Sequence, residues 1–391
     1  MSPRHCPHDR RELAARLALL TVPGLKAEQA ISLVEATGSA RLAFDALGDV
    51  FGGDMAAAAR TERVRQRTRR ALQAVEEQGL HVVTFDDELY PARLSGYLTD
   101  YRPPVLFGRG DLSLVQPQCI AIVGSRSASE YGLDVAEDAA RHVAHAGGCV
   151  VSGVALGVDA AAHRAALEAD GATIGVLGCG VDVFYPRRNM ELQERIGRCG
   201  LLLSEQLPGE PPRKHQFPYR NRIIAALSSA VLIVEAGAKS GALSTAGHAA
   251  DLGVDVFVVP HAIDRPNAAG NLRLFREGAP VYTGARDMLE QVGLMGVGDP
   301  VPAASGDMEY PPPGPEAARI WDSLDARGRH VDSIAAAVGM PVDEVLVALL
   351  DLELDGYAIQ LGGGRFTRRR RERRILKQKE AADGNSAAAA G

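Results

Sequence analysis

The stretch CIAIVGSRSASEYG, residues 119–132, is the part of the sequence from which the fold can be argued most directly. It opens with consecutive apolar residues, Cys119–Val123, and then changes to Gly, Ser and Arg before a helical pattern begins. A short apolar run without polar interruptions is typical of a strand buried on both faces, as in a parallel sheet. A glycine-rich turn between such a strand and a helix presents unpaired backbone N–H groups to an anion. The stretch therefore predicts an α/β fold with an anion-binding turn.

Similar short apolar runs recur along the chain, separated by helical segments of about a dozen residues, which is the length that crossovers between parallel strands require. These runs are 149–152, 173–177, 201–204, 231–234 and 256–259. Joined by right-handed crossovers, they predict an α/β domain with a doubly wound, mostly parallel, Rossmann-like sheet.

The segments on either side of these strands differ in composition and predict further domains. Residues 1–80 have the apolar spacing of helices, with Val22-Pro23-Gly24-Leu25 as a turn between the first two. This pattern fits an all-helical, helix-hairpin-helix or SAM-like domain, although it also occurs in any helical hairpin. We expect the chain to divide into a helical N-terminal domain (1–80), a Rossmann-like domain (81–295), a linker rich in Pro and Gly (296–315), a winged-helix domain (316–367) and a basic, disordered tail (368–391).

Composition and charge exclude several classes of protein. Of the 391 residues, 46% are hydrophobic and 24% are charged, which excludes collagen-like, coiled-coil and wholly disordered chains. The formal net charge is −6, although residues 365–379 contain nine Arg or Lys and one Glu. The five cysteines lack C-x-x-C spacing, so we expect neither a disulfide framework nor a zinc site. No apolar run is long enough for a transmembrane helix, so we expect no membrane contact and a cytoplasmic location.

Motifs for cofactor binding and catalysis are missing from the sequence. There is no G-K-[ST] for a Walker A loop, and the pattern G-x-G-x-x-G fails after Gly178-Cys179-Gly180. Ser152, Asp159 and His163 are close in sequence but lack the defined spacing of a catalytic triad. We therefore expect no metal, no cofactor and no catalytic residue.

Three glycine-rich turns at strand ends predict where an anion binds, because ligands of open α/β sheets bind beyond the carboxyl ends of the strands. The glycines of these turns are Gly124, Gly153, Gly157 and Gly241. Tight turns alone would explain the glycines but would not explain Arg126 and Lys239 in the same turns. We interpret the three turns as one anion-binding surface.

The segment KHQFPYRNR, residues 214–222, indicates that the anion is a polymer. Cations alternate there with aromatic rings, which suits single-stranded nucleic acid because its phosphates attract cations and its unstacked bases need flat surfaces. Alternatively, Phe217 and Tyr219 fill the core while the arginines cap neighbouring helices. Arg126 and Lys239, expected on the same face, favour binding.

Seven segments carry a resemblance to a known family: IAIVGSRSASEYG (120–132), SGVALGVDAAAH (152–163), VLGCGVDVFYP (176–186), SEQLPG (204–209), FPYRNRIIAALS (217–228), SGALSTAGHAADLGVDVFVVP (240–260) and GNLRLFREGA (270–279). They cover the whole α/β domain and resemble the bacterial DNA-processing protein A family (DprA, also called Smf). Many members of that family also have an N-terminal helical domain and a C-terminal winged helix. The chain departs from the family pattern where His261 replaces a Gly and where Ala242 replaces a Ser.

The resemblance implies a non-catalytic protein that binds single-stranded DNA and helps to load RecA onto it in natural transformation and recombination. It also implies a homodimer formed through the α/β domain, with Leu274 and Phe275 as candidate interface residues; ordinary helix packing would explain these two equally well. Carried onto this chain, the single-stranded DNA contacts are Ser125, Arg126, Lys214, Phe217, Arg220, Asn221, Arg222, Lys239 and Ser240.

A nucleotide-binding enzyme on a related fold is one alternative. Nucleoside-monophosphate phosphoribohydrolases carry a P-G-G-x-G-T-x-x-E motif whose Glu is a catalytic acid. In this chain no Glu follows Thr245 at that spacing.

A regulator that binds duplex DNA through the winged helix is another alternative. The third helix expected there, residues 342–354, contains four acidic residues and no Lys or Arg, which is unfavourable next to phosphates and favours protein contact. The run Arg368–Arg374 could still bind duplex DNA weakly.

Overall fold

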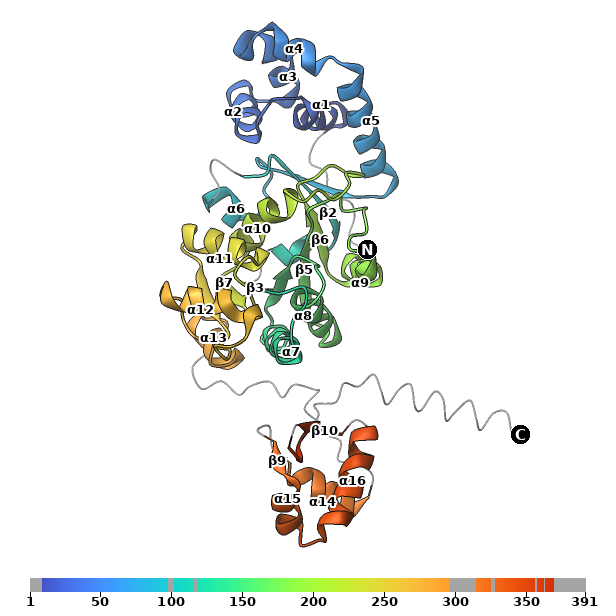
Figure 1. Cartoon of the computed structure of the whole chain (residues 1–391). Helices are drawn as coiled ribbons and strands as arrows, with labels where there is room; N and C mark the ends of the chain where they lie inside the picture. Colours follow the sequence, from blue (N-terminus) through green and yellow to red (C-terminus); the bar gives the residue numbers. More distant parts are fainter. Residues whose placement is uncertain are drawn as a thin grey trace, which may run out of the picture. The chain divides into compact units, whose positions relative to one another are not determined.

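The computed structural model describes residues 9–97, 102–115, 118–295, 314–324, 328–355, 357–361 and 363–368 (Figure 1). Contacts divide the chain into two compact units, residues 1–302 and 303–391. The finer division into five segments stays a prediction, because most of the expected linker and the tail beyond Arg368 lie outside the described residues.

The first unit is built around an eight-stranded sheet with the strand order β1-β2-β6-β5-β4-β3-β7-β8. The strands are β1 His81–Thr84, β2 Val105–Gly110, β3 Cys119–Val123, β4 Cys149–Ser152, β5 Ala172–Val176, β6 Leu201–Ser204, β7 Ala230–Ile233 and β8 Asp255–Val258. The strands from β3 to β8 are parallel, whereas β1 and β2 form an antiparallel edge beside β6. The predicted α/β, mostly parallel fold is confirmed; β5, β7 and β8 each begin and end one residue earlier than predicted.

Helices cover both faces of this sheet (Figure 1). They are α6 Ala92–Tyr97, α7 Glu130–His145, α8 Val158–Glu168, α9 Met190–Cys199, α10 Gln216–Leu227, α11 Gly241–Asp251, α12 Ala269–Arg276 and α13 Ala285–Gln291. Ile120 and Ile122 of β3 pack with residues of α7, α8 and α13. Cys119, Ala121 and Val123 pack in the other core cluster, with residues of α10 and α11. Since strand side chains alternate between the two faces, every residue of β3 is buried.

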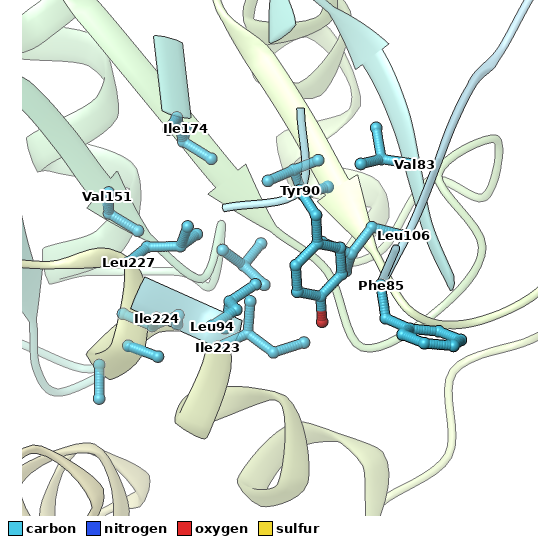
Figure 2. Packing of buried hydrophobic residues seen from close by; sticks show 14 of the residues in the cluster. Val83, Phe85, Tyr90, Leu94, Leu106, Val151, Ile174, Ile223, Ile224 and Leu227 are labelled. Atoms are coloured by element: carbon cyan, nitrogen blue, oxygen red, sulfur yellow. The ribbon is translucent and has the colours of Figure 1, made fainter. Parts of the chain in front are cut away.

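The helix α10 is anchored to the sheet by apolar residues. Ile223 and Leu227 belong to a buried cluster that extends to Leu94 of α6 and Leu106 of β2 (Figure 2). The charged and aromatic segment predicted to bind nucleic acid therefore includes the first turns of a firmly packed helix.

The helical N-terminal part contacts the antiparallel edge of the sheet. Its helices are α1 Arg10–Thr21, α2 Ala27–Thr37, α3 Ala40–Phe51, α4 Gly53–Ala59 and α5 Glu62–Glu77. The turn between α1 and α2 contains Gly24 at φ +83°, a left-handed conformation that favours glycine. Leu17 of α1 and Val75 of α5 pack in one cluster with Val82 of β1 and Phe107 of β2.

The second unit contains the helices and the small sheet of a winged helix, as predicted. Its elements are α14 Pro315–Asp322, β9 Arg329–His330, α15 Val331–Val338, α16 Val342–Leu354, β10 Ala358–Leu361 and β11 Arg365–Arg368. The strands form an antiparallel sheet in the order β10-β11-β9. Trp321, Leu349 and Phe366 lie in its core. Among the described residues no single helix is long and apolar enough to cross a membrane, and only α15 and α16 taken together, bent by 107°, pass that test.

Candidate nucleic-acid interface

The order of the parallel strands creates one switch point in the sheet. From β3 the chain proceeds outward through β4, β5 and β6, and then returns to form β7 and β8 on the other side of β3. The crossovers on the two sides of β3 diverge, and open α/β sheets bind ligands at such a switch point, beyond the carboxyl ends of β3 and β7. The turns that carry Arg126 and Lys239 follow these two strands.

Two of the predicted loop glycines allow the turns after β3 and β4 to touch. Gly157 has φ +74°, and a Cβ atom there would overlap the carbonyl oxygen of Ser125. The backbone N–H of Val158, the first residue of α8, donates to that same oxygen at 3.2 Å. A Cβ on Gly124 would lie 2.7 Å from a methyl carbon of Val158. Gly241, by contrast, has open space around it, so no close contact there requires a glycine.

The third glycine, Gly153, lies against a buried pair of charges, Arg220 and Asp159. Asp159 accepts hydrogen bonds from the backbone N–H groups of Gly153 at 3.1 Å and Ala155 at 3.3 Å. Burial raises the pKa of Asp159, and the nearby guanidinium of Arg220 opposes this shift. Burial lowers the pKa of Arg220 to about 10, so the side chain stays charged at neutral pH.

Arg220, which we expected to contact DNA, is buried. Its guanidinium donates to the carbonyl oxygen of Gly153 at 3.0 Å and to that of Val176. These carbonyls lie at the ends of β4 and β5, so Arg220 connects α10 to the strand ends from beneath the turns. Because the guanidinium is enclosed in this way, the role of Arg220 is structural.

Asn221 and Arg222, which we also expected to contact DNA, are buried as well. Asn221 donates to the carbonyl oxygen of Gly241 at 3.1 Å. Arg222 pairs with Glu205 at 2.8 and 2.5 Å, and the two side chains are only 3% and 10% exposed. The guanidinium of Arg222 also lies 3.7 Å from the ring centroid of Tyr219. These contacts hold α10 in place and leave neither side chain facing solvent.

The remaining predicted residues are accessible, and two of them meet. Arg126 is exposed, and its guanidinium carbon lies 5.8 Å from the ring centroid of the half-buried Phe217. Lys214 and Lys239 are exposed. The structure therefore brings the turn after β3 and the start of α10 together in a cation–ring contact at the switch point.

The predicted hydroxyls cap local backbone. The Ser125 hydroxyl oxygen accepts from the N–H of Ser127 at 3.1 Å, and that of Ser240 accepts from the N–H of Ala242 at 3.3 Å. Both side chains are half-buried, and each keeps its own O–H as a donor.

The turn after β7 lies beside α10. Ser244, in the first turns of α11, donates to the carbonyl oxygen of Pro218 at 3.5 Å. Together with the bond between Asn221 and Gly241, this contact places the start of α11 next to the start of α10. Three segments that are far apart in the sequence thus line one surface.

Tyr185 also belongs to this surface, although we did not predict it from the sequence. It is 37% exposed, and its ring centroid lies 5.3 Å from that of Phe217. The exposed Arg187 and Arg188 follow after Pro186. The sequence signal that could have identified Tyr185 was an aromatic residue close to two arginines, after a predicted strand.

Glu235 and Asn271 shape the ends of β7 and β8, and sequence reasoning assigned no role to either. The buried Glu235 carboxylate accepts hydrogen bonds from the N–H and, at 2.6 Å, the hydroxyl of Ser129, at the start of α7. The buried Asn271 amide donates to the carbonyl oxygens of Val234 at 3.0 Å and Val259 at 2.9 Å. Both side chains are thereby occupied by backbone and cap contacts.

Both departures from the family pattern lie near these strand ends. The His261 ring nitrogen Nε2 is 2.9 Å from the Val234 carbonyl oxygen, and the ring meets Tyr131 edge-on at 5.2 Å. Ala242 is buried in the first turn of α11. Neither change interrupts the sheet or the helix.

The candidate dimer residues are only partly accessible. Leu274 and Phe275 of α12 are half-buried and pack against the core on the α10 side of the sheet. Ile263, in the loop before α12, is 88% exposed and presents more apolar surface.

The described residues contain no group of three or more His, Cys, Asp or Glu side chains that could hold a metal. Ser152, Asp159 and His163 do not form a triad, because each has other partners. Ser152 donates to the Ile122 carbonyl oxygen at 2.7 Å, and His163 lies 2.7 Å from the Thr173 hydroxyl.

Comparison with known proteins identifies the family of the chain. Residues 81–293 match the family model described as DNA recombination-mediator protein A. The chain belongs to that family. Residues 304–364 match the family model described as the DprA winged helix domain. The resemblance predicted from the seven segments is confirmed.

Named proteins and solved structures of this family resemble the chain. The putative DNA processing protein DprA of Mycobacterium tuberculosis H37Rv is 37% identical over 346 residues, which cover 84% of this chain and 88% of that protein. The solved structure of DNA processing protein A from Streptococcus pneumoniae is 35% identical with a TM-score of 0.59, covering 71% of this chain and 97% of that chain. A Helicobacter pylori DNA processing protein A, solved to study its single-stranded DNA binding mode, is 33% identical with a TM-score of 0.49, covering 54% of this chain and 95% of that chain.

Proposed function

We propose that this chain binds single-stranded DNA at the switch point beyond β3 and β7 and helps to load RecA onto the bound strand. The observation that carries the proposal is the accessible contact between Arg126 and Phe217 at the switch point of the sheet. Membership in a DNA recombination-mediator family supports the same substrate.

In this proposal the accessible residues share the contacts with the strand. Arg126, Lys214 and Lys239 bind phosphates, and the hydroxyls of Ser125 and Ser240 donate to phosphate oxygens. Phe217 stacks on a base. The loop glycines Gly124, Gly153, Gly157 and Gly241 leave room for the turns, so that the first turns of α8 and α11 come close to the strand. Arg220, Asn221 and Arg222 support the surface from below.

The accessible part of the Phe217 ring favours a single strand over a duplex. Bases in a duplex are stacked on one another, so only an unpaired and unstacked base can lie flat on Phe217. The carboxylates of Asp159 and Glu235 are buried and hydrogen-bonded to backbone N–H groups, which favours a binding protein over a hydrolytic enzyme.

The wider role in the proposal follows from the family. Two chains pair through the α/β domain, using Leu274 and Phe275 together with the exposed Ile263. Pairing would join two DNA surfaces and increase affinity without new kinds of contact. Acting in the cytoplasm without cofactor or catalysis, the dimer would present a strand to RecA during recombination and natural transformation.

The proposal is tested with fluorescent oligonucleotides, single-stranded and duplex, across a salt series. We expect a preference for single strands. The double variant Arg126→Ala/Lys239→Ala should bind more weakly, with a slope of log K against log salt reduced by about 1.4, since each phosphate contact on a single strand contributes about 0.7. Arg286→Ala on α13, where Arg286 is 46% exposed, is the matched control and should leave the slope unchanged. Equal affinity for duplex, untouched by the double variant, would refute the proposed surface.

RecA loading has a separate readout. RecA filaments should form faster on strands covered by single-strand binding protein when the chain is present, and the double variant should lose this acceleration. Acceleration by the double variant equal to that of the natural chain would show that loading does not use this surface.

A further inference from the structure

The outward side of α16 in the second unit is apolar. The core side of this helix consists of Val345, Leu349 and Leu352. The opposite side carries Leu346, Val347, Leu350 and Leu354, here called the α16 face, with Val347 61% and Leu354 86% exposed. A helix on the surface of a soluble domain normally presents polar residues to water, and contiguous exposed apolar residues mark a site of interaction.

Carboxylates border the α16 face on one side. A groove between α14 and α16 is lined by Glu316, Asp343, Glu344, Val347, Ala348 and Asp351. Its lining includes no cation, and no ion pair or side-chain hydrogen bond joins any of these four carboxylates to another described residue. A partner for this surface must therefore combine apolar side chains with positive charge.

We propose that residues 369–379 of the same chain occupy the α16 face and its groove. Their sequence, RRRERRILKQK, contains seven Arg or Lys and one Glu, with Ile375-Leu376 among the cations. The two apolar residues cover the leucines of α16, while the flanking cations pair with the carboxylates of the groove.

The start of this segment is anchored close to the groove. Arg368, the last described residue, donates to the carbonyl oxygens of Trp321 and Asp322, both at 2.9 Å, and its guanidinium carbon lies 4.3 Å from the ring centroid of Trp321. Trp321 and Asp322 end the same helix, α14, that carries Glu316 in the groove. Along a helix the five residues from Glu316 to Trp321 span roughly 8 Å, and an extended chain covers that distance in about three residues.

Charge argues against the other occupants. A second α16 face would bring a second set of carboxylates next to the first. A DNA backbone would meet the same repulsion. While residues 369–379 are docked on the α16 face, their arginines are withheld from DNA. The contact therefore regulates any binding of duplex DNA by this segment. The inference rests only on the second unit and is independent of the proposed DNA site beyond β3 and β7.

The first test is carbodiimide crosslinking of the full chain, which joins an amine to a carboxylate only when the two are in direct contact. We expect Lys377 or Lys379 to be joined to Glu316, Asp343, Glu344 or Asp351 within one chain. The variant Leu350→Ser/Leu354→Ser keeps every charge and changes only exposed side chains. It should reduce these crosslinks by about tenfold or more, since burying a leucine contributes at least that factor. Leu42→Ser on α3, where Leu42 is 57% exposed, is the matched control.

The second test is duplex binding at low salt. If the segment is docked nine-tenths of the time, undocking it raises its apparent affinity by about tenfold. The variant Leu350→Ser/Leu354→Ser should show this gain in affinity. The gain should disappear when the same variant is truncated after Arg368. Two results would overturn the proposal: tail lysines joined to carboxylates outside the groove regardless of the leucine variant, or crosslinks found only between labelled and unlabelled chains.

Discussion

Removal of the Phe217 ring separates base stacking from charge in the proposed DNA site. The ring is half-buried at the switch point of the sheet. Its centroid lies 5.3 Å from that of Tyr185 and 5.8 Å from the guanidinium carbon of Arg126. Stacking of one base on an aromatic side chain contributes about 1–3 kcal/mol. Phe217→Ala should therefore weaken single-strand binding by about 5- to 150-fold.

The salt dependence identifies the cause of that loss. Phe217→Ala removes no charge, so its slope of log K against log salt should equal that of the natural chain, whereas Arg126→Ala should lower the slope by about 0.7. Phe217→Tyr keeps the ring and serves as the matched control, with affinity close to that of the natural chain. Fluorescence anisotropy across the salt series measures both quantities, and urea unfolding checks that each variant is folded. Unchanged affinity in folded Phe217→Ala, or an equal loss in Phe217→Tyr, would refute stacking on this ring.

Further predictions concern the framework of the site. Gly157→Ala should reduce the free energy of unfolding by at least about 2 kcal/mol, because φ is +74° and a Cβ would overlap backbone; Gly241→Ala, with open space around it, should be neutral in the same urea titration. Arg222→Ala should cost about 3–5 kcal/mol by leaving Glu205 buried without its partner, and replacing both residues by apolar ones should recover part of that loss. Burial lowers the pKa of His163 to about 3 from 6.5, so below pH 6.5 the unfolded chain binds more protons and stability falls. Lowering the pH from 7 to 5 should reduce the free energy of unfolding by about 2 kcal/mol through His163. In urea unfolding at the two pH values, His163→Leu should show a correspondingly smaller reduction.

The parts of the site that could be predicted from sequence depend on local pattern. The turn after β3 was located because an apolar run ends in Gly124, Ser125 and Arg126, and strand ends are where α/β sheets bind ligands. The order of the strands was not predictable, because pairing depends on contacts between segments distant in the sequence. The meeting of Arg126 with Phe217 follows from that order and from the packing of α10.

Within residues 214–222 the sequence does not distinguish an arginine that binds DNA from one that is buried. Arg220 and Arg222 look the same as exposed cations in the sequence, yet one is enclosed by strand-end carbonyls and the other by Glu205. Buried charge is rare unless it is paired, and the partners come from strand ends far along the chain. Tyr185 was missed for the same reason, since only folding places it against Phe217.

By itself the sequence determined the fold class, the family and the approximate position of each strand, because hydrophobic period and turn residues act over a few neighbouring positions. Tertiary structure alone decided which polar side chains face solvent. Burial is a property of the packed chain, in which α10 turns Arg220 and Arg222 inward while Phe217 remains half-accessible beside Arg126.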